Sequence, residues 1–368
     1  MRVAVVHDWL VTNAGAEKVL RAILELYPNS DIFSLVDFLD EEDKNTLLDN
    51  RFTKTSFIQK LPSAKNHFRN YLPLFPKAIE SFDLTQYDLI ISSSWAVAKG
   101  VKTHNRQLHI CYSHTPIRYA WDLYNEYIAN LKQPKRFLVE QTLKYIRDWD
   151  IKTLNRVNYF IANSKFVKER IKRIYKRDAK VIYPPVNISK FTLYLEKEDF
   201  YLTASRLVPY KKTKLIVETF NKMPNRKLIV IGDGEEFKSI KEIAKSNIRL
   251  LGYQKDNVLI SYMQRAKGFI YGAVEDFGIV PIEAMACGTP VIALNRGGTA
   301  ETIIDGVTGV HFNNQNVNSI IEAVDIFEKL DFNFKNISTY AKKFSTQRFK
   351  SEFREHVDNL VKKKFTFQ

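Results

Sequence analysis

The sequence has few cysteines and no long apolar run. It contains two cysteines, Cys111 and Cys287, which excludes a disulfide framework. Because both lie within apolar stretches, we expect buried thiols and a reducing, cytoplasmic setting. No stretch of about 18 apolar residues exists, which excludes a helix that spans a membrane. The start, MRVAVVHDWL, resembles a strand rather than a signal peptide, since its apolar run is short and no cleavage-like site follows.

Internal repeats and low-complexity tracts are also absent. The chain of 368 residues is too long for one ordinary core, so two domains are expected. Its apolar content of 45% and charged content of 26% are typical of soluble globular proteins.

Short apolar runs alternate with longer amphipathic ones, which is typical of α/β layers with mainly parallel sheets. The dipeptide Pro184-Pro185 can continue neither a strand nor a helix, so it marks a boundary. We expect two doubly wound domains, residues 1–185 and 186–345, that face a central cleft, with a helix in residues 346–368 crossing back to the first. The expected strands are Arg2–His7, Asp31–Leu35, Leu89–Ser92, His109–Tyr112, Tyr159–Ala162, Phe200–Ala204, Lys227–Ile231, Ile248–Leu251, Gly268–Tyr271 and Pro290–Ala293; the expected helices include Glu17–Leu26, Phe137–Val157 and Thr346–Lys364.

Acidic residues are in the minority, and the formal net charge is +15. Such an excess suits nucleic acid, an anionic membrane surface or phosphorylated substrates as partners. The sequence contains no recognisable nucleic-acid-binding module and no single dominant basic stripe, so no nucleic acid partner is expected.

The basic residues are concentrated in two segments. Ser164–Lys180 indicates a solvated helix face. In Phe52–Ile79, bases interleave with aromatic and apolar side chains and no acid is present, a composition that suits an anionic membrane interface. The alternative for this second segment is a loop and helix packed on their own domain.

Two carboxylates, Glu275 and Glu283, lie eight positions apart on either side of a Phe277-Gly278 turn. If Gly278 closes a loop and Ile279 opens a helix, the backbone N–H groups there form an anion site. The pair then suits a ligand with a phosphate centre and sugar hydroxyls on both flanks. The alternative is that these acids merely favour the N-terminus of a helix.

Further candidates follow the ends of other expected strands. Arg206 and Lys211 are placed to clamp a diphosphate, or are two solvated cations. The turn at Gly15 lets a diphosphate approach the backbone, or is an ordinary strand–helix connection. Gly232 lies in a glycine turn, in which Asp233 either caps the next helix or has only a local structural role. Tyr253 follows another expected strand and could lie beside a nucleobase.

Metal ligands are not indicated. His114 follows a strand and can donate to a phosphate or to sugar hydroxyls, but His104, His109 and His114 are spaced by five, which matches no usual metal pattern. Asp148-Trp149-Asp150 has the D-x-D form of metal-dependent sugar transferases. It lies within a long helical pattern rather than after a strand, so solvated helix acids are expected.

Over nearly the whole chain these residues resemble the family 4 glycosyltransferases, retaining enzymes of the GT-B fold. The most specific part is Glu275–Gly288 (EDFGIVPIEAMACG), and Ser205–Lys211 (SRLVPYK), Gly232–Gly234 and His114-Thr115-Pro116 match in order. The segments HDWL, AEKV and RYAWD near the N-terminus look like bacterial mannosyltransferases of O-antigen and capsule assembly. The chain departs from the family in having only Gly15 before Ala16-Glu17-Lys18, where two or three glycines are usual.

The resemblance implies a transfer of mannose from GDP-mannose to a glycan or lipid-linked oligosaccharide held by the N-terminal domain, at the inner face of the cell membrane. A UDP-sugar donor, a non-transferase GT-B enzyme and a nucleic-acid-binding protein are the alternatives. Arg206 and Lys211 would neutralise the leaving diphosphate, Glu283 would hold the ribose, and Glu275 and His114 would contact the sugar, with no metal or other cofactor. The implied catalytic residues are Glu275, His114, Arg206 and Lys211, and the implied donor-binding residues are Gly15, Arg206, Lys211, Gly232, Tyr253, Glu275, Phe277, Gly278, Ile279, Val280 and Glu283.

Overall fold

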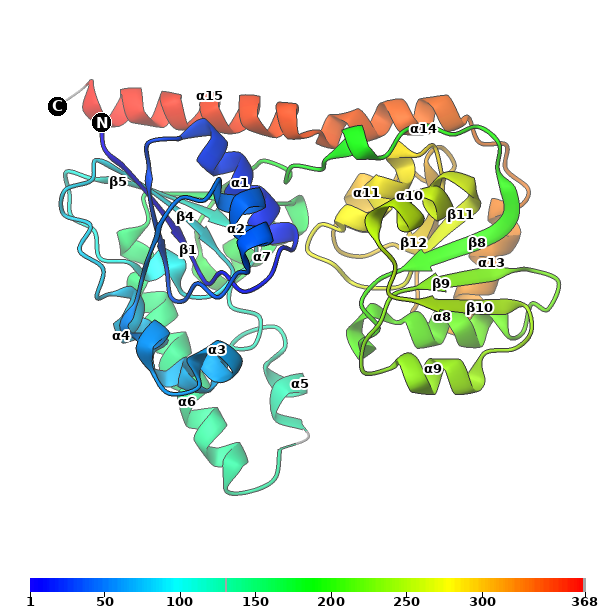
Figure 1. The fold of residues 1–368 in the computed structure, drawn as a ribbon, viewed down its shortest axis with the longest axis horizontal. Coiled ribbons are helices and arrows are strands. Elements are labelled where there is room, and N and C mark those ends of the chain that lie inside the picture. The colour runs from blue at the N-terminus through cyan, green and yellow to red at the C-terminus, as the bar shows by residue number, and fades with distance from the viewer. Residues whose placement is uncertain (130, 367–368) are drawn as a thin grey trace. The chain divides into compact units, whose positions relative to one another are not determined.

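A computed structural model describes residues 1–129 and 131–366 and divides the chain into two compact units (Figure 1). The N-terminal unit comprises residues 1–183 together with the C-terminal segment from Phe349, and the C-terminal unit is Pro184–Arg348. In the described part of the chain, no helix has both the length and the hydropathy needed to cross a bilayer.

The N-terminal unit is built on a seven-stranded sheet in the order β3-β2-β1-β4-β5-β6-β7, and every pairing is parallel. The order reverses between β1 and β4, which makes this pair a topological switch point. The strands are β1 (Val3–His7), β2 (Asp31–Ser34), β3 (Thr53–Thr55), β4 (Leu89–Ser94), β5 (Leu108–Ser113), β6 (Tyr159–Ala162) and β7 (Ala179–Val181). The helices are α1 (Gly15–Leu26), α2 (Glu41–Leu48), α3 (Ala64–His67), α4 (Phe75–Ile79), α5 (Tyr124–Ala129), α6 (Lys135–Lys152), α7 (Lys165–Tyr175) and α15 (Thr346–Phe365).

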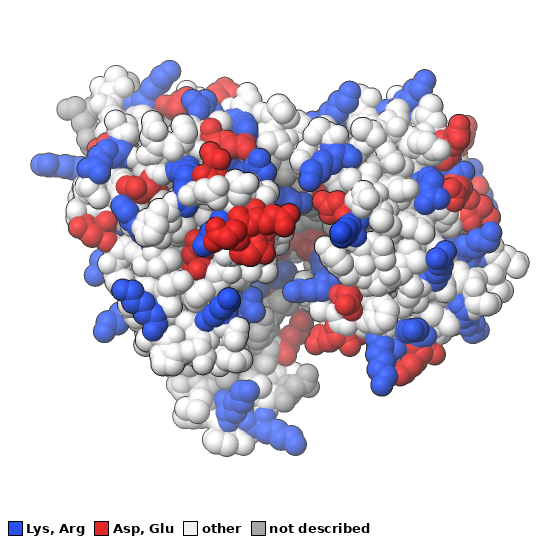
Figure 2. Space-filling view, in the orientation of Figure 1, with Lys and Arg blue, Asp and Glu red and all other residues white. Residues whose placement is uncertain are grey.

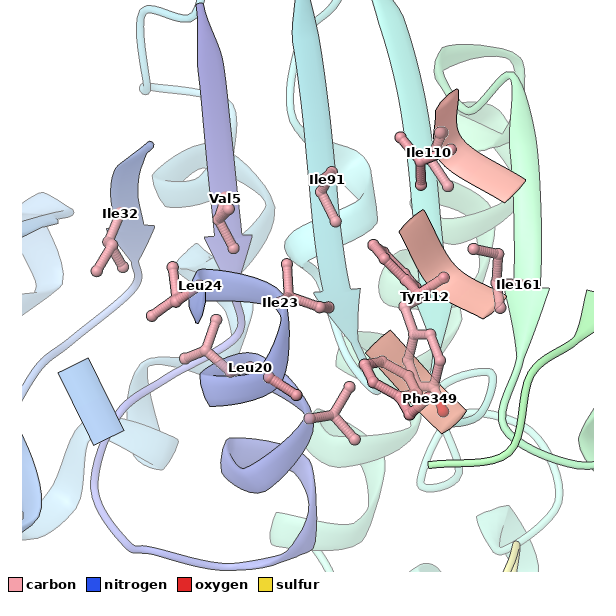
Figure 3. Close-up of a cluster of buried hydrophobic side chains, with 14 of the residues drawn as sticks. Val5, Leu20, Ile23, Leu24, Ile32, Ile91, Ile110, Tyr112, Ile161 and Phe349 are labelled. Atoms are coloured by element: carbon pink, nitrogen blue, oxygen red, sulfur yellow. The ribbon is translucent and has the colours of Figure 1, made fainter. Parts of the chain in front are cut away.

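Both faces of this sheet are buried, because successive strand residues point to opposite sides. Val5 and Ile91 contribute to the core beneath α1, whereas Ala4, Val6 and Ile90 belong to a second core on the other face. Figure 3 shows strand residues of the first core packed against Leu20, Ile23 and Leu24 of α1 and against Phe349 of α15. The apolar face of α15, which comprises Phe349, Phe353, Val357 and Leu360, is therefore part of the N-terminal core.

The C-terminal unit repeats this architecture with six parallel strands in the order β10-β9-β8-β11-β12-β13, and its switch point lies between β8 and β11. The strands are β8 (Glu198–Ala204), β9 (Leu228–Ile231), β10 (Ile248–Gly252), β11 (Ala266–Tyr271), β12 (Val291–Leu294) and β13 (Gly309–Phe312). The helices are α8 (Thr213–Phe220), α9 (Phe237–Ile243), α10 (Asp256–Arg265), α11 (Ile279–Ala286), α12 (Thr299–Thr302), α13 (Val317–Phe327) and α14 (Phe334–Ala341). Two parallel-sheet α/β units confirm the predicted fold class.

Two side chains that were predicted to be solvated, Asp150 and Arg170, are buried. Asp150 of α6 is fully buried and forms an ion pair with Lys99, with 2.8 Å between Oδ1 and Nζ, while Asp148 remains exposed. Within Ser164–Lys180, Arg170 of α7 is buried and its Nε lies 2.5 Å from Oδ2 of Asp122. The prediction was wrong for these residues because each charge has a specific partner contributed by a distant segment.

The segment Phe52–Ile79 is divided between core and surface. Phe68 and Phe75 belong to the second N-terminal core, so the alternative of packing on its own domain holds for them. Phe52 and Leu74 are exposed, at 80% and 38%, and exposed bases lie along the same segment. Figure 2 shows Lys and Arg side chains spread over the visible face and interspersed with acids, rather than gathered into one stripe.

Candidate active site

Lys211 and Glu275 meet at the carboxyl ends of β8 and β11, the two strands of the C-terminal switch point. The Lys211 Nζ atom lies 2.5 Å from Oε1 of Glu275, and each side chain keeps a little under a fifth of its surface exposed. The Tyr271 hydroxyl at the end of β11 lies 3.2 Å from both groups. Burial, followed by the nearby Glu275 carboxylate, raises the pKa of Tyr271 well above its usual value, so the phenol keeps its proton and donates to Glu275.

The pairing of Lys211 with Glu275 was not expected, because the sequence assigned them to different parts of a ligand. In the structure the two charges neutralise each other in a partly exposed position. Tyr271 was missed altogether. As the last residue of a buried strand it occupies a position from which parallel α/β sheets contact ligands, and that placement was a usable signal.

The loop before α11 has the geometry that the sequence predicted. Gly278 has φ +89°, a left-handed conformation that favours glycine, and Ile279 begins the helix. The first N–H groups of a helix have no intrahelical acceptor, so those of α11 are available to an anion at the end of β11.

Two glycines hold this loop in place. The carbonyl oxygen of Glu275 accepts from the N–H of Gly298 at 2.8 Å. A Cβ atom at Gly297 would lie 2.4 Å from the carbonyl oxygen of Glu275. A Cβ atom at Gly298 would lie 2.2 Å from the carbonyl oxygen of Phe277. Side chains larger than hydrogen at either position would therefore displace the loop.

Phe277 and Glu283 are both buried. The Phe277 ring contacts Phe344, with 5.8 Å between the ring centroids, so it supports the loop from within the unit. Glu283 lies in the second turn of α11 and is 7% exposed.

The other predicted residues of this unit lie on the loops that follow β8, β9 and β10. Arg206 is exposed and its Nη2 donates to the Tyr210 hydroxyl at 3.2 Å. Gly232 has φ +138°, and a Cβ there would lie 1.8 Å from the Ser205 carbonyl oxygen, so only glycine allows the β8 and β9 loops to touch. Asp233 accepts from the N–H of Gly234 at 2.7 Å and acts locally. Tyr253 is 75% exposed and follows the edge strand β10. In the sheet, β9 and β8 lie between β10 and β11.

His114 and Gly15 belong to the N-terminal unit. Gly15 begins α1 directly after the β1 loop. His114 follows β5, and its Nε2 lies 2.8 Å from the Ser93 hydroxyl oxygen. Burial of the ring, followed by the proximity of His7, lowers the pKa of His114 to about 3, so the ring is neutral near pH 7.

Asp8 was not predicted as a site residue, yet it organises the end of β1. Its buried carboxylate accepts from four consecutive backbone N–H groups, those of residues 95–98, at 2.6 to 2.9 Å. The turn after β4 is thereby fixed next to the β1 loop. In the sequence its signals were its position directly after an apolar strand and its place in the segment HDWL.

Comparison with known proteins assigns a family to both units. Residues 36–190 match the family model "Glycosyltransferase Family 4", and residues 187–344 match the model "Glycosyl transferases group 1". The chain belongs to the family 4 glycosyltransferases. Its two parallel-sheet units form the GT-B fold of that family.

Individual relatives are named as glycosyltransferases of different or unassigned specificity. An uncharacterised glycosyltransferase of Methanocaldococcus jannaschii is 33% identical over 51% of this chain and 56% of its own length. The alpha-1,3/1,6-mannosyltransferase ALG2 of Mus musculus is 26% identical over 58% of this chain and 62% of its own. The chain thus spans little more than half the length of these relatives. HepE of Anabaena, which was solved with UDP-glucose, shares the fold with a TM-score of 0.68 and 19% sequence identity. The match covers 98% of this chain and 100% of HepE.

Proposed function

We propose that the chain is a retaining glycosyltransferase that transfers a hexose from a sugar nucleotide to a carbohydrate acceptor. The observation that carries the proposal is the grouping of Lys211, Glu275 and the N-terminus of α11 at the switch point between β8 and β11. Cations and helix N–H groups stabilise a diphosphate, while a carboxylate accepts hydrogen bonds from sugar hydroxyls. A sugar nucleotide contains both chemical groups.

The proposed donor is GDP-mannose. It is supported by the N-terminal motifs of this chain and by a relative named as a mannosyltransferase. A UDP-sugar is the second candidate, because HepE, which shares the fold, was solved with UDP-glucose. The proposed acceptor is a glycan or a lipid-linked oligosaccharide, which the N-terminal unit would bind.

The reaction breaks the bond between the sugar C1 and the diphosphate oxygen and forms a bond from C1 to the acceptor oxygen on the same face. The acceptor proton passes to the leaving phosphate oxygen. Lys211 exchanges its ion pair with Glu275 for the diphosphate, and Arg206 and the N–H groups of residues 278–280 add further stabilisation as negative charge develops. Glu275 is thereby released to bind a sugar hydroxyl, and Glu283 holds the ribose. Because Lys211, Arg206 and these N–H groups already neutralise the negative charge of the diphosphate, we propose that no metal ion is needed.

The donor is tested by incubating the purified chain with GDP-mannose, UDP-glucose, UDP-galactose and UDP-N-acetylglucosamine in the presence of a chelator. Release of GDP from GDP-mannose is the expected result. Release of UDP alone would replace the donor while keeping the reaction class, and activity restored only by added Mg²⁺ or Mn²⁺ would refute metal independence.

Substitutions at the switch point test the division of roles. Lys211→Met and Glu275→Gln each remove a charge that acts on the reacting groups, so turnover should fall by about 10²–10³-fold. Glu283→Gln should instead weaken nucleotide binding with a smaller effect on turnover, because the ribose does not react. The matched control is Lys238→Met, which removes an exposed lysine of the same unit. Steady-state kinetics and calorimetric titration of the nucleotide separate these effects, and full turnover in Lys211→Met would contradict the proposal.

A further inference from the structure

A line of polar side chains crosses three neighbouring strands of the N-terminal sheet. His7 ends β1 and is the register partner of Ser93 in β4. The Ser93 hydroxyl oxygen lies 3.1 Å from Nδ1 of His7 and 2.8 Å from Nε2 of His114, which follows β5. The Trp95 ring packs edge-on against both imidazoles, with 4.8 Å between its centroid and that of His7 and 5.5 Å between its centroid and that of His114.

The line ends at a buried carboxylate. Oε1 of Glu17 in α1 lies 3.8 Å from Nε2 of His7, and both side chains are buried. The other oxygen of Glu17 accepts from the N–H of Ala14 at 3.1 Å, which fixes the orientation of the carboxylate. Nε2 of His7 is buried and makes no hydrogen bond. Glu17 therefore acts on His7 through its charge rather than through direct hydrogen bonding.

A serine hydroxyl has a single hydrogen, so Ser93 can donate to only one of the two imidazoles and must accept from the other. A hydrogen on Nε2 of His7 is attracted to the Glu17 carboxylate, whereas a lone pair there would be repelled. Neutral His7 then has a bare Nδ1, to which Ser93 donates. Ser93 consequently accepts from Nε2 of His114.

We propose that Glu17, His7 and Ser93 hold the proton of neutral His114 on Nε2, so that its Nδ1 presents a lone pair that recognises a hydroxyl hydrogen of a carbohydrate. The proposal rests on the proposed function for the identity of the ligand, and it makes Glu17, His7 and Ser93 positioning residues. A lone pair cannot bind a phosphate oxygen, which is itself an acceptor. His114 would accordingly discriminate sugar hydroxyls from diphosphate oxygens.

The reverse polarity would require a different state of His7. A doubly protonated His7 would donate through Nδ1 to Ser93, which would then donate to His114 and leave Nδ1 of His114 protonated. That arrangement places an imidazolium in the core with the Glu17 carboxylate oxygen beyond hydrogen-bond distance, at 3.8 Å. The lowered pKa of His114, to about 3 through burial, agrees with a neutral ring in either arrangement.

The proton position is measured by NMR on the full chain selectively labelled with ¹⁵N-histidine, because the two ring nitrogens of a neutral imidazole give well-separated signals. His114→Asn assigns the resonances by their loss. We expect the tautomer protonated at Nε2 for His114 at pH 7, and a ring protonated at Nδ1 would overturn the proposal. No substrate is needed, so this result is independent of the transferase activity.

Two further arms use the same signals. In Ser93→Ala the His114 signals should move to the average of two tautomers, while in Ser92→Ala, which removes the neighbouring Ser92–His109 hydrogen bond at 2.8 Å, they should stay in place. Unchanged His114 signals in Ser93→Ala would overturn the positioning role. Titration with inorganic pyrophosphate should leave Nδ1 of His114 unmoved, and a saturable shift of that nitrogen would show that it binds an anion instead.

Discussion

The two units share a parallel-sheet architecture but place their charges differently. Among the described residues, the N-terminal unit buries seven side chains that are acidic, basic or histidine, whereas the C-terminal unit buries one, Glu283. The seven are His7, Asp8, Glu17, Lys99, His109, Asp150 and Arg170. The N-terminal unit thus shapes its loops by hydrogen bonds and ion pairs that originate in the core.

The C-terminal unit shapes its loops with backbone conformation instead. In the described part of the chain, all seven glycines with positive φ belong to this unit. Arg206, Lys211 and Glu275 of the candidate site lie on these loops, and Lys211 and Glu275 are partly exposed. Exposed charges can change partners at little cost when a ligand binds, whereas buried charges lose much stability when a partner is lost. The comparison predicts that charge substitutions and acid will damage the N-terminal unit selectively.

A convenient probe separates the two units in solution. The chain has four tryptophans, Trp9, Trp95, Trp121 and Trp149, and all of them belong to the N-terminal unit. Tryptophan fluorescence during urea unfolding therefore follows that unit alone.

The largest effect is expected from Asp150→Asn. Asp150 binds Lys99 at 2.8 Å and also accepts from the indole N–H of Trp121 at 2.8 Å. Removal of the carboxylate charge leaves the Lys99 ammonium buried without a counter-ion, which should cost about 3–5 kcal/mol of unfolding free energy. The shift in the urea midpoint of tryptophan fluorescence measures this loss.

Two controls accompany this substitution. Asp148→Asn changes an exposed acid of the same helix and should alter the free energy of unfolding by less than about 0.5 kcal/mol. The double substitution Lys99→Met with Asp150→Asn removes both charges and keeps an acceptor for the Trp121 indole N–H, so it should recover most of the loss. Equal midpoints for Asp150→Asn and Asp148→Asn would show that the buried pair does not stabilise the unit.

A second effect, smaller for each group involved, is expected from mild acid. Burial lowers the pKa of His109 to about 4 and that of His114 to about 3, against about 6.5 in the unfolded chain. As the pH falls below 6.5, the unfolded state takes up protons that the folded state does not, so the stability of the N-terminal unit decreases. At pH 5 the decrease should be about 2 kcal/mol for each histidine.

The measurement compares urea midpoints of tryptophan fluorescence at pH 7 and pH 5. In His109→Gln one titrating group is absent, so the dependence on pH should be shallower than in the unsubstituted chain. The C-terminal unit contains a single histidine, His311, and provides the contrast by hydrogen exchange of its peptides. A midpoint that does not change between the two pH values would remove the proposed difference between the units.

Sequence patterns predicted the fold well where strands are long and apolar, and less well elsewhere. β4 continues to Ser94, beyond the predicted end at Ser92, because its serines are buried and hydrogen-bonded to histidines of neighbouring strands. Their polarity hid them from a hydropathy pattern. β3 and β7 were missed because each has only three residues, too few for an alternation to be recognised, and the four-residue strand β13 was missed as well.

The candidate site was predictable in its positions but not in its pairings. Lys211 and Glu275 were located at the correct strand ends, yet their contact follows from the adjacency of β8 and β11, which are separated by the two intervening strands in the sequence. Asp8 and Ser93 were missed because their partners come from distant segments, residues 95–98 for Asp8 and His114 for Ser93. Local spacing carries no information on such contacts.

The smallest effect concerns the surface of the N-terminal unit. Exposed Lys60, Lys65 and Arg69 accompany the exposed Phe52 and Leu74 in the segment Phe52–Ile79. If this segment contacts an anionic membrane, reversing the three charges to Glu should lower the affinity for vesicles of phosphatidylglycerol and phosphatidylcholine. Each basic residue near such a surface contributes about 1 kcal/mol at physiological ionic strength. Co-sedimentation at several lipid concentrations measures the change.

The matched control reverses three exposed lysines of the C-terminal unit, Lys238, Lys241 and Lys255, which changes the net charge of the chain by the same amount. A loss of affinity in the first triple variant alone would assign membrane contact to Phe52–Ile79, since it depends on where the charge lies. An equal loss in both variants would mean that vesicles respond only to the overall charge of +15. The surfaces of the two units would then be equivalent, and the contrast between them would be confined to their interiors.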